Sequence, residues 1–320
     1  MVEPGCGAGG VNALAPVVAV RSTPLSFQIG ARTLLAVKRS LVRVAVSLDE
    51  AREGRLPMLP PLPREADGYV VTSLPEERLD AMIASGRMIG FVRQRYLRYH
   101  ADLTGTYDAY LARLSSSARQ GVKRKMRKVA QLSGGKIDVR RFVTPDELRA
   151  FHGIARGIAR RTYQERLLGE ALPDSPAFVD WMLARAAEDA VRAWLLYIGG
   201  EPAAYLYCPA QGDTLIYEFV GHDPRFNELS PGAVLQMEAF RELFAEGRFA
   251  RFDFTEGEGQ HKRQFSTGSV PCLDLLLLRP SFANRLTTAA LGGFNRVVAG
   301  GKAAAQRAGA DGLARKLRRG

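Results

Sequence analysis

A chain of 320 residues with 46% hydrophobic content can bury a substantial core, and its length predicts about two domains. The formal net charge of +12 favours anionic partners, such as nucleotide phosphates, an acidic carrier protein, nucleic acid or an anionic membrane. Three cysteines exclude a disulfide framework, and no apolar run is long enough for a transmembrane helix. We therefore expect a cytoplasmic protein, and the N-terminus shows no secretory signal pattern.

The first hundred residues predict a flexible terminus followed by a small α+β unit. Residues 1–26 include a glycine pattern at Gly5–Gly10, which we reject as a dinucleotide site because no strand precedes it. Alternating apolar and basic residues at 32–47 predict one or two strands, with a possible turn at Lys38–Ser40. A short strand at 69–72, a helix at 75–85 and a strand at 88–96 complete this half, residues 27–104.

The next predicted elements are two helices, at 107–114 and 118–132, with Ser115–Ser117 as a break and cap between them. The second carries six cations and no acid, so they form a positive stripe: Arg119, Lys123, Arg124, Lys125, Arg127 and Lys128. A solvated surface balanced by acids elsewhere is one interpretation of this stripe. A surface that receives a phosphate, a carrier protein or tRNA is the other.

A strand at 137–142 leads to a helix that begins with Thr144 as its cap. Its polar end, Tyr163, Gln164, Glu165 and Arg166, is our candidate for acceptor recognition, against the alternative of an ordinary helix end. Ser175 caps another helix over 177–189, and a hairpin over 192–208 follows.

The most informative stretch is 215–265. Leu215–Val220 has the composition of one buried strand that contains a single acid, Glu218. Ser230 and Pro231 predict the start of a helix whose first turn is left bare by Gly232, which suits a phosphate group. A strand at 249–254 places Asp253 on the face opposite its phenylalanine neighbours. A polar turn with His261 and Lys262 follows it, and a last strand is predicted at 270–278.

These residues carry a family resemblance. The order Pro231-Gly232, Asp253-Phe254 with Gly257, then His261-Lys262 and Phe265 is similar to the "PG … DF..G … YK..F" pattern of FemAB-like acyltransferases, including the CelD-type domain, within the GNAT superfamily. The likeness covers about residues 107–279. His261 stands where that pattern has tyrosine, which puts the role of the tyrosine's phenol in doubt.

The resemblance implies an α/β GNAT-type acyl-CoA N-acyltransferase fold, a mixed central sheet flanked by helices. In the family the N-terminal half is often a degenerate second GNAT copy, although no internal repeat shows this here. The implied domains are the N-terminal half, an acyltransferase domain at 105–280 and a basic helical tail at 281–320. We expect that tail to be solvated, with peripheral contact to anionic lipid as the alternative.

The resemblance also implies a site for acyl-CoA without a metal. The cofactor groups would be the main chain of Phe219 and Val220, the turn at Pro231, Gly232 and Ala233, and Lys262. Burial would make Glu218 a general base, with an edge-facing or ion-paired glutamate as the alternative. Asp253 is a second base, an amine anchor or a buried cap for the next turn. His261 is a candidate proton shuttle, or an ordinary surface histidine.

The predicted function is acyl transfer, with acetyl as the expected group, from acyl-CoA to an amine or hydroxyl acceptor by direct attack in a ternary complex. One alternative is FemAB-type aminoacyl transfer from charged tRNA to a peptide or cell-wall precursor, and acyl carrier protein is an alternative donor. A further alternative is a non-catalytic basic adaptor that binds nucleic acid or an anionic surface. The four histidines lack metal-ligand spacing, and the cysteines Cys208 and Cys272 lie in apolar strands where a thiol is inert.

Overall fold

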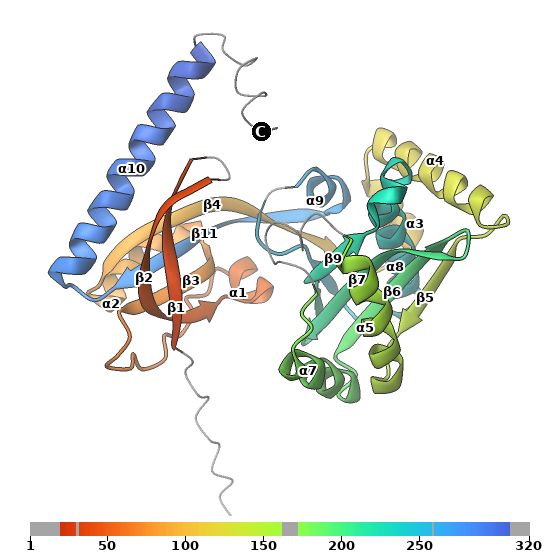
Figure 1. Cartoon of the computed structure of the whole chain (residues 1–320), viewed down its shortest axis with the longest axis horizontal. Helices are drawn as coiled ribbons and strands as arrows, with labels where there is room; N and C mark the ends of the chain where they lie inside the picture. The colour runs from red at the N-terminus through yellow and green to blue at the C-terminus, as the bar shows by residue number, and fades with distance from the viewer. Residues whose placement is uncertain (1–19, 30–31, 162–171, 258, 308–320) are drawn as a thin grey trace, which may run out of the picture. The chain divides into compact units, whose positions relative to one another are not determined.

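The computed structural model describes residues 20–29, 32–161, 172–257 and 259–307 (Figure 1). The chain divides into two compact units. One comprises residues 1–50, 54–94 and 273–320, and the other comprises residues 51–53 and 95–272. The long strands β4 (Ile89–Asp102) and β11 (Gly268–Leu278) contribute residues to both units.

The first unit is built on strands in the order β1-β2-β3-β11-β4. Its remaining elements are β1 (Val20–Ile29), β2 (Arg32–Ala45), α1 (Leu48–Arg52, which extends into the second unit), β3 (Gly68–Pro75), η1 (Glu76–Arg78), α2 (Leu79–Gly86) and α10 (Phe282–Arg307). β1 and β2 are antiparallel, whereas β2 and β3 are parallel. Leu25, Leu41 and Leu276 form a small core with Leu291 of α10, which lies along this sheet.

Two features of this unit differ from the sequence prediction. β1 begins at Val20, inside the segment expected to be flexible. β2 runs without a turn through Lys38–Ser40, because each of these residues pairs across to β1. The strand at β1 was missed because Ser22, Thr23 and Gln28 give it weak apolar alternation.

The second unit contains strands in the order β4-β10-β8-β7-β6-β5, with β9 paired to β7 off this path. Its strands are β5 (Asp138–Phe142), β6 (Val191–Ile198), β7 (Glu201–Gln211), β8 (Thr214–Ile216), β9 (Phe219–His222) and β10 (Arg251–Asp253). Its helices are α3 (Tyr107–Arg113), α4 (Ser116–Leu132), α5 (Pro145–Ala159), α7 (Pro176–Ala187), η2 (Pro224–Leu229), α8 (Pro231–Glu246) and α9 (Gln260–Phe265). β8 and β10 are parallel and the other pairs are antiparallel, so the sheet is mixed as predicted.

Strand β7 separates two hydrophobic cores in this unit. Leu206 and Cys208 face a core shared with α3, α4 and α8, while Tyr205 and Tyr207 face a core shared with α5 and α7. The alternation of side chains along a strand produces this division. Helices therefore cover both faces of the sheet, which fixes α8 on one face and α5 and α7 on the other.

The capping predictions for α4, α5 and α7 are confirmed. Ser115 and Ser175 accept hydrogen bonds from the first turns of α4 and α7, and Thr144 and Glu147 form a complete capping box at α5. Such caps satisfy backbone N–H groups that the helix itself leaves unpaired. Within the described ranges, no helix combines the length and hydropathy needed to cross a bilayer.

Candidate active site

The predicted strand at Leu215–Val220 is divided in the structure. β8 ends at Ile216, and β9 begins at Phe219. Between the residue pairs Tyr207/Phe219 and Ala210/Leu215, β7 has two residues and its partner has three, so Tyr217 and Glu218 lie in a bulge. The single continuous strand is therefore the wrong prediction, because an extra residue breaks the register.

The bulge is also the point where the chain leaves β10. The backbone N–H of Tyr217 donates to the carbonyl of Asp253 at 2.9 Å, the last contact of the parallel pair β8–β10. Beyond it β9 pairs only with β7 in the described part of the sheet. The parallel strands β8 and β10 thus diverge at their carboxyl ends, where α/β sheets commonly bind ligands.

Strand β9 has one open edge. The N–H of Asp223 donates to Ala203 of β7 at 2.8 Å, and antiparallel pairing alternates from there. Phe219 therefore directs its backbone groups toward β7, whereas Val220 and His222 direct theirs toward the edge that no described strand covers. Gly221 is required here, since a Cβ atom would lie 2.5 Å from the Tyr205 ring.

Helix α8 begins close after β9 and contacts it. Pro231 is its first residue, as predicted, but Ser230 adopts a left-handed conformation (φ 50°) and its side chain caps nothing. A Cβ atom added to Gly232 would meet nothing within 4 Å, and its φ is not left-handed. The first turn contains no acid. Neither packing nor backbone geometry explains the glycine, and the space beside the helix start is open.

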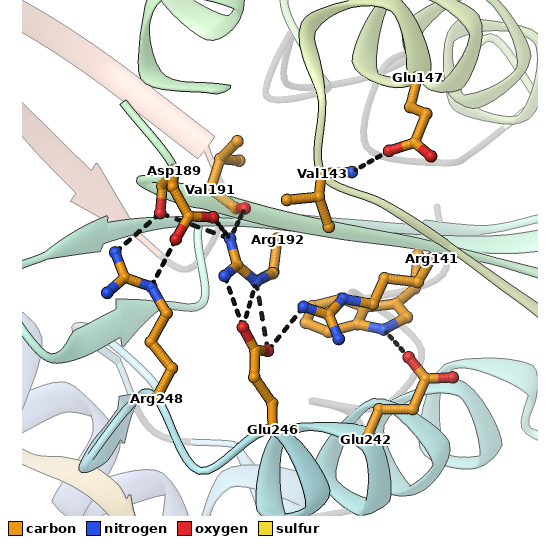
Figure 2. Close-up of polar contacts among 10 residues, drawn as sticks. Arg141, Val143, Glu147, Asp189, Val191, Arg192, Glu242, Glu246 and Arg248 are labelled. Atoms are coloured by element: carbon orange, nitrogen blue, oxygen red, sulfur yellow. Dashed lines mark hydrogen bonds and ion pairs between the residues drawn. The ribbon is translucent and has the colours of Figure 1, made fainter. Parts of the chain in front are cut away.

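The other end of α8 is densely bonded (Figure 2). Arg192, with a side chain only 3% exposed, donates to Glu246 at 2.5 Å and to Asp189 at 2.7 Å. Arg141 also reaches Glu246, at 2.7 Å, and Arg248 pairs with Asp189. These cations interact favourably with the negative end of the helix dipole. Their ion pairs also hold the helix against β5 and β6.

Asp253 is buried and fully engaged. Its carboxylate lies 2.5 Å from Arg98 Nη2 and 3.2 Å from Arg98 Nε, and it accepts the backbone N–H of Thr255 at 2.9 Å. Burial lowers the pKa of Arg98, but the hydrogen bonds and charge of Asp253 outweigh this and leave that pKa raised. Among the predicted roles of Asp253, this geometry favours the buried cap of the next turn; the ion pair with Arg98 was not predicted.

The polar turn predicted after Asp253 contains a helix, α9, which carries His261 and Lys262. The His261 ring packs near Tyr217, with 5.9 Å between ring centroids. Partial burial lowers the pKa of His261, and the charge of Lys262 lowers it further. Lys262 Nζ donates to the carbonyl of Glu256 at 2.5 Å, and burial lowers its pKa while Asp253 and Glu256 oppose that shift.

Glu218 is exposed in the bulge and is not within a buried strand. That correction removes desolvation as the reason to expect a base there. Tyr207, missed in the sequence prediction, has a fully buried hydroxyl with no hydrogen-bond partner in the described part of the chain. Burial raises the pKa of Tyr207, and the charge of Glu218 raises it further, so the two groups interact electrostatically.

The structure thus places Glu218 next to Tyr217 in the bulge, and the His261 ring of α9 packs near Tyr217. The candidate acceptor residues Tyr163, Gln164, Glu165 and Arg166 lie outside the described residues. Arg98 was also missed in the sequence prediction, although an arginine between Leu97 and Tyr99 was a signal of a buried ion pair. Cys208 and Cys272 are buried and form no disulfide within the described residues, and burial raises the pKa of the Cys208 thiol.

Comparison with known proteins identifies this arrangement. Residues 116–263 match the family described as Acetyltransferase (GNAT) domain. These residues form a GNAT acetyltransferase domain. The match runs from α4 to α9 and includes the bulge, the start of α8 and His261. It confirms the GNAT-type α/β fold and indicates a transferase of acyl groups.

Solved structures share the fold at low sequence identity. FemX has a TM-score of 0.50 at 10% identity, covering 84% of this chain and 90% of that one. The C-terminal domain of a putative lysylphosphatidylglycerol synthetase from Agrobacterium fabrum has the same score and identity, covering 70% and 72%. At this identity the two likenesses show a shared fold. No curated protein matches the chain.

Proposed function

We propose that this GNAT domain transfers an acyl group, with acetyl as the expected group, from acyl-CoA to an amine or hydroxyl acceptor. The reaction is direct attack in a ternary complex. The observation that carries this proposal is the open edge of β9 beside the open start of α8. The amides of an extended chain can pair with the open edge of β9, and a pyrophosphate can bind at the start of α8.

The cofactor contacts follow from which backbone groups remain free. The backbone groups of Val220 and His222 face the open edge of β9. We therefore propose that these two residues bind the pantetheine amides, and His222 replaces Phe219 of the sequence prediction. At the helix start Pro231 has no N–H, and the N–H of Ala233 is bonded to Ser230 at 3.0 Å. Gly232 therefore offers the accessible N–H for a phosphate oxygen, with Lys262 as the proposed cationic contact.

Acyl transfer requires a deprotonated acceptor and a polarised thioester carbonyl. We assign the base to His261 or Glu218, since both border the bulge and Asp253 is held by Arg98. The lowered pKa of His261 keeps its imidazole neutral at pH 7 and able to accept a proton. A His261→Gln variant is expected to lose about 100-fold in kcat. A variant with unchanged kcat assigns the base to Glu218, which Glu218→Gln then tests.

A second candidate is a macromolecular donor, charged tRNA or acyl carrier protein. Its support is α4, whose exposed cations have no ion-pair partner within the described residues: Arg119, Lys123, Arg124, Arg127 and Lys128. Phosphates or an acidic protein would complement this surface. Tyr163, Gln164, Glu165 and Arg166 remain the proposed acceptor residues in either case.

Calorimetric titration of the full chain with acetyl-CoA, at low and at moderate salt, tests the proposal. We expect saturable binding at one site with a modest loss at higher salt, because backbone groups make most of the contacts. No binding of acetyl-CoA would reject acyl-CoA as the donor. Parallel titrations with aminoacyl-tRNA and acyl carrier protein then test the second candidate, for which affinity should fall steeply with salt.

A further inference from the structure

Helix α10 of the first unit has two apolar faces. The inner face is held to the sheet: Arg39 of β2 donates to Asn284 at 2.9 Å and to Thr287 at 2.6 Å. Further along, Phe294 packs edge to face against Phe27 with 5.4 Å between centroids. These contacts fix which side of the helix faces the sheet.

The outer face carries large exposed apolar side chains. Phe282 is 83% exposed, Leu286 60% and Val297 75%. At about 3.6 residues per turn these three fall within about 60° of one another. Leu291, which is buried, lies on the opposite side of the helix. Between them the outer face has only small exposed residues, Ala289, Ala290 and Gly293, so the apolar stripe is not interrupted by a charge.

Cations border this stripe. Arg285 and Arg296 are exposed on one flank, and neither has an ion-pair partner among the described residues. The sequence contains no acid between Phe282 and Arg307, and none between Val20 and Ala45, the strands beneath the helix. The local surface is therefore positive as well as apolar.

We propose that the outer stripe of α10 binds the surface of an anionic membrane. Apolar side chains beside unpaired arginines suit a helix that lies in the interface, with its apolar side among acyl chains and its cations at the headgroups. A second copy of this chain is the competing occupant. Pairing two stripes would bring Arg285 and Arg296 of both copies together without an acid nearby, and this repulsion favours the lipid.

Co-sedimentation of the full chain with vesicles tests the proposal. We expect binding to phosphatidylcholine vesicles that contain about one-third phosphatidylglycerol, and at least about tenfold weaker binding to phosphatidylcholine alone. The variant Phe282→Gln with Leu286→Gln should bind the anionic vesicles at least about tenfold more weakly. The control Leu56→Gln with Met58→Gln removes two other exposed apolar side chains of the same unit and should bind like the wild type.

Three results would overturn the proposal. The first is that the wild type does not bind anionic vesicles. The second is that the α10 variant binds them as well as the control does. The third is a dimer in analytical ultracentrifugation that the α10 variant abolishes, which assigns the stripe to a second copy. Thermal unfolding midpoints of the variants, expected to match the wild type because the substituted side chains are exposed, show that any loss of binding is not a loss of folding.

Discussion

The two ends of α8 differ in their side-chain contacts with the rest of the protein. At the carboxyl end Glu246 is shared by Arg192 and Arg141 (Figure 2). Nearby, Glu242 accepts the indole N–H of Trp194 at 2.8 Å. At the amino end the side chain of Ser230 caps nothing, and Gly232 borders open space. One helix thus has its partners supplied by the protein at one end and lacks them at the other.

This difference distinguishes the carboxyl end of α8, which stabilises the fold, from its amino end, which we propose binds the ligand. A helix start normally receives a side-chain cap or an acid, because its free N–H groups and dipole favour negative charge. α8 has neither, while its far end is held by buried ion pairs that fix the helix in place. The ion pairs at the far end hold the helix in place, and at its start the N–H of Gly232 has no hydrogen-bond partner among the described residues, whereas Ala233 and Val234 are bonded to Ser230. A positioned helix start with an available N–H suits the binding of an anion. The following predictions test this contrast.

The largest effect is expected at the bonded end. Arg192→Met leaves Glu246 and Asp189 without their shared buried partner, so the free energy of unfolding should fall by about 3–5 kcal/mol. Urea denaturation measures it. Arg140→Gln is the control, since its pair with Asp138 is exposed and should change stability by less than about 1 kcal/mol. Equal losses in the two variants would show that the network is not the anchor.

The second prediction concerns Asp253, and it tests whether this residue beside the proposed site has a structural or a catalytic role. It lies beside the bulge but is buried with Arg98, so we expect Asp253→Asn to lower the free energy of unfolding by about 3 kcal/mol. The folded fraction should keep its affinity for acetyl-CoA and most of its kcat. A stable variant that has lost about 100-fold in kcat would instead make Asp253 the catalytic base.

Gly232→Glu tests the open end. The carboxylate occupies the proposed pyrophosphate position, so the affinity for acetyl-CoA should fall by at least about 30-fold, or about 2 kcal/mol. Stability should not fall, because the added Cβ atom meets no protein atom within 4 Å and an acid is favourable at a helix start. Gly153→Glu, an exposed helical glycine in α5 with equally open surroundings, should leave binding unchanged. Wild-type affinity in Gly232→Glu would place the pyrophosphate elsewhere.

The smallest effect concerns pH. Burial lowers the pKa of His100, which pairs with Asp253 across β4 and β10, and partial burial lowers that of His261. The unfolded chain then binds more protons than the folded chain below the ordinary histidine pKa of about 6.5. Stability should therefore be constant above that pH and decline as the pH falls from 6.5 toward 5. His100→Gln should flatten this decline in urea titrations, and an unchanged slope would exclude His100 as a source.

The sequence predicted what local chemistry decides. Pro231 at the start of α8 and the caps Ser115, Thr144 and Ser175 depend on neighbouring residues only, and the structure confirms them. The cap predicted at Ser230 is wrong, since Ser230 is left-handed and its side chain accepts no hydrogen bond from the helix. The motif order from Pro231 to Phe265 also predicted the GNAT fold.

The features missed in the sequence depend on distant partners. Leu215–Val220 is uniform in composition, and the break at Tyr217 arises only from its register with β7. Arg98 and Asp253 are 155 residues apart, so no spacing indicates their pair. Glu218 was expected to be buried because its neighbours are apolar, and the bulge exposes it.

Hydrogen exchange with and without acetyl-CoA tests the contrast between the two ends of α8 most directly. We predict slower exchange in peptides that contain Val220, His222 and Gly232 when acetyl-CoA is present. Peptides that cover the carboxyl end of α8 around Glu246 should exchange at the same rate in both conditions, since their partners are already supplied by the protein. Protection confined to the Glu246 end, or absent from residues 219–234, would contradict the account.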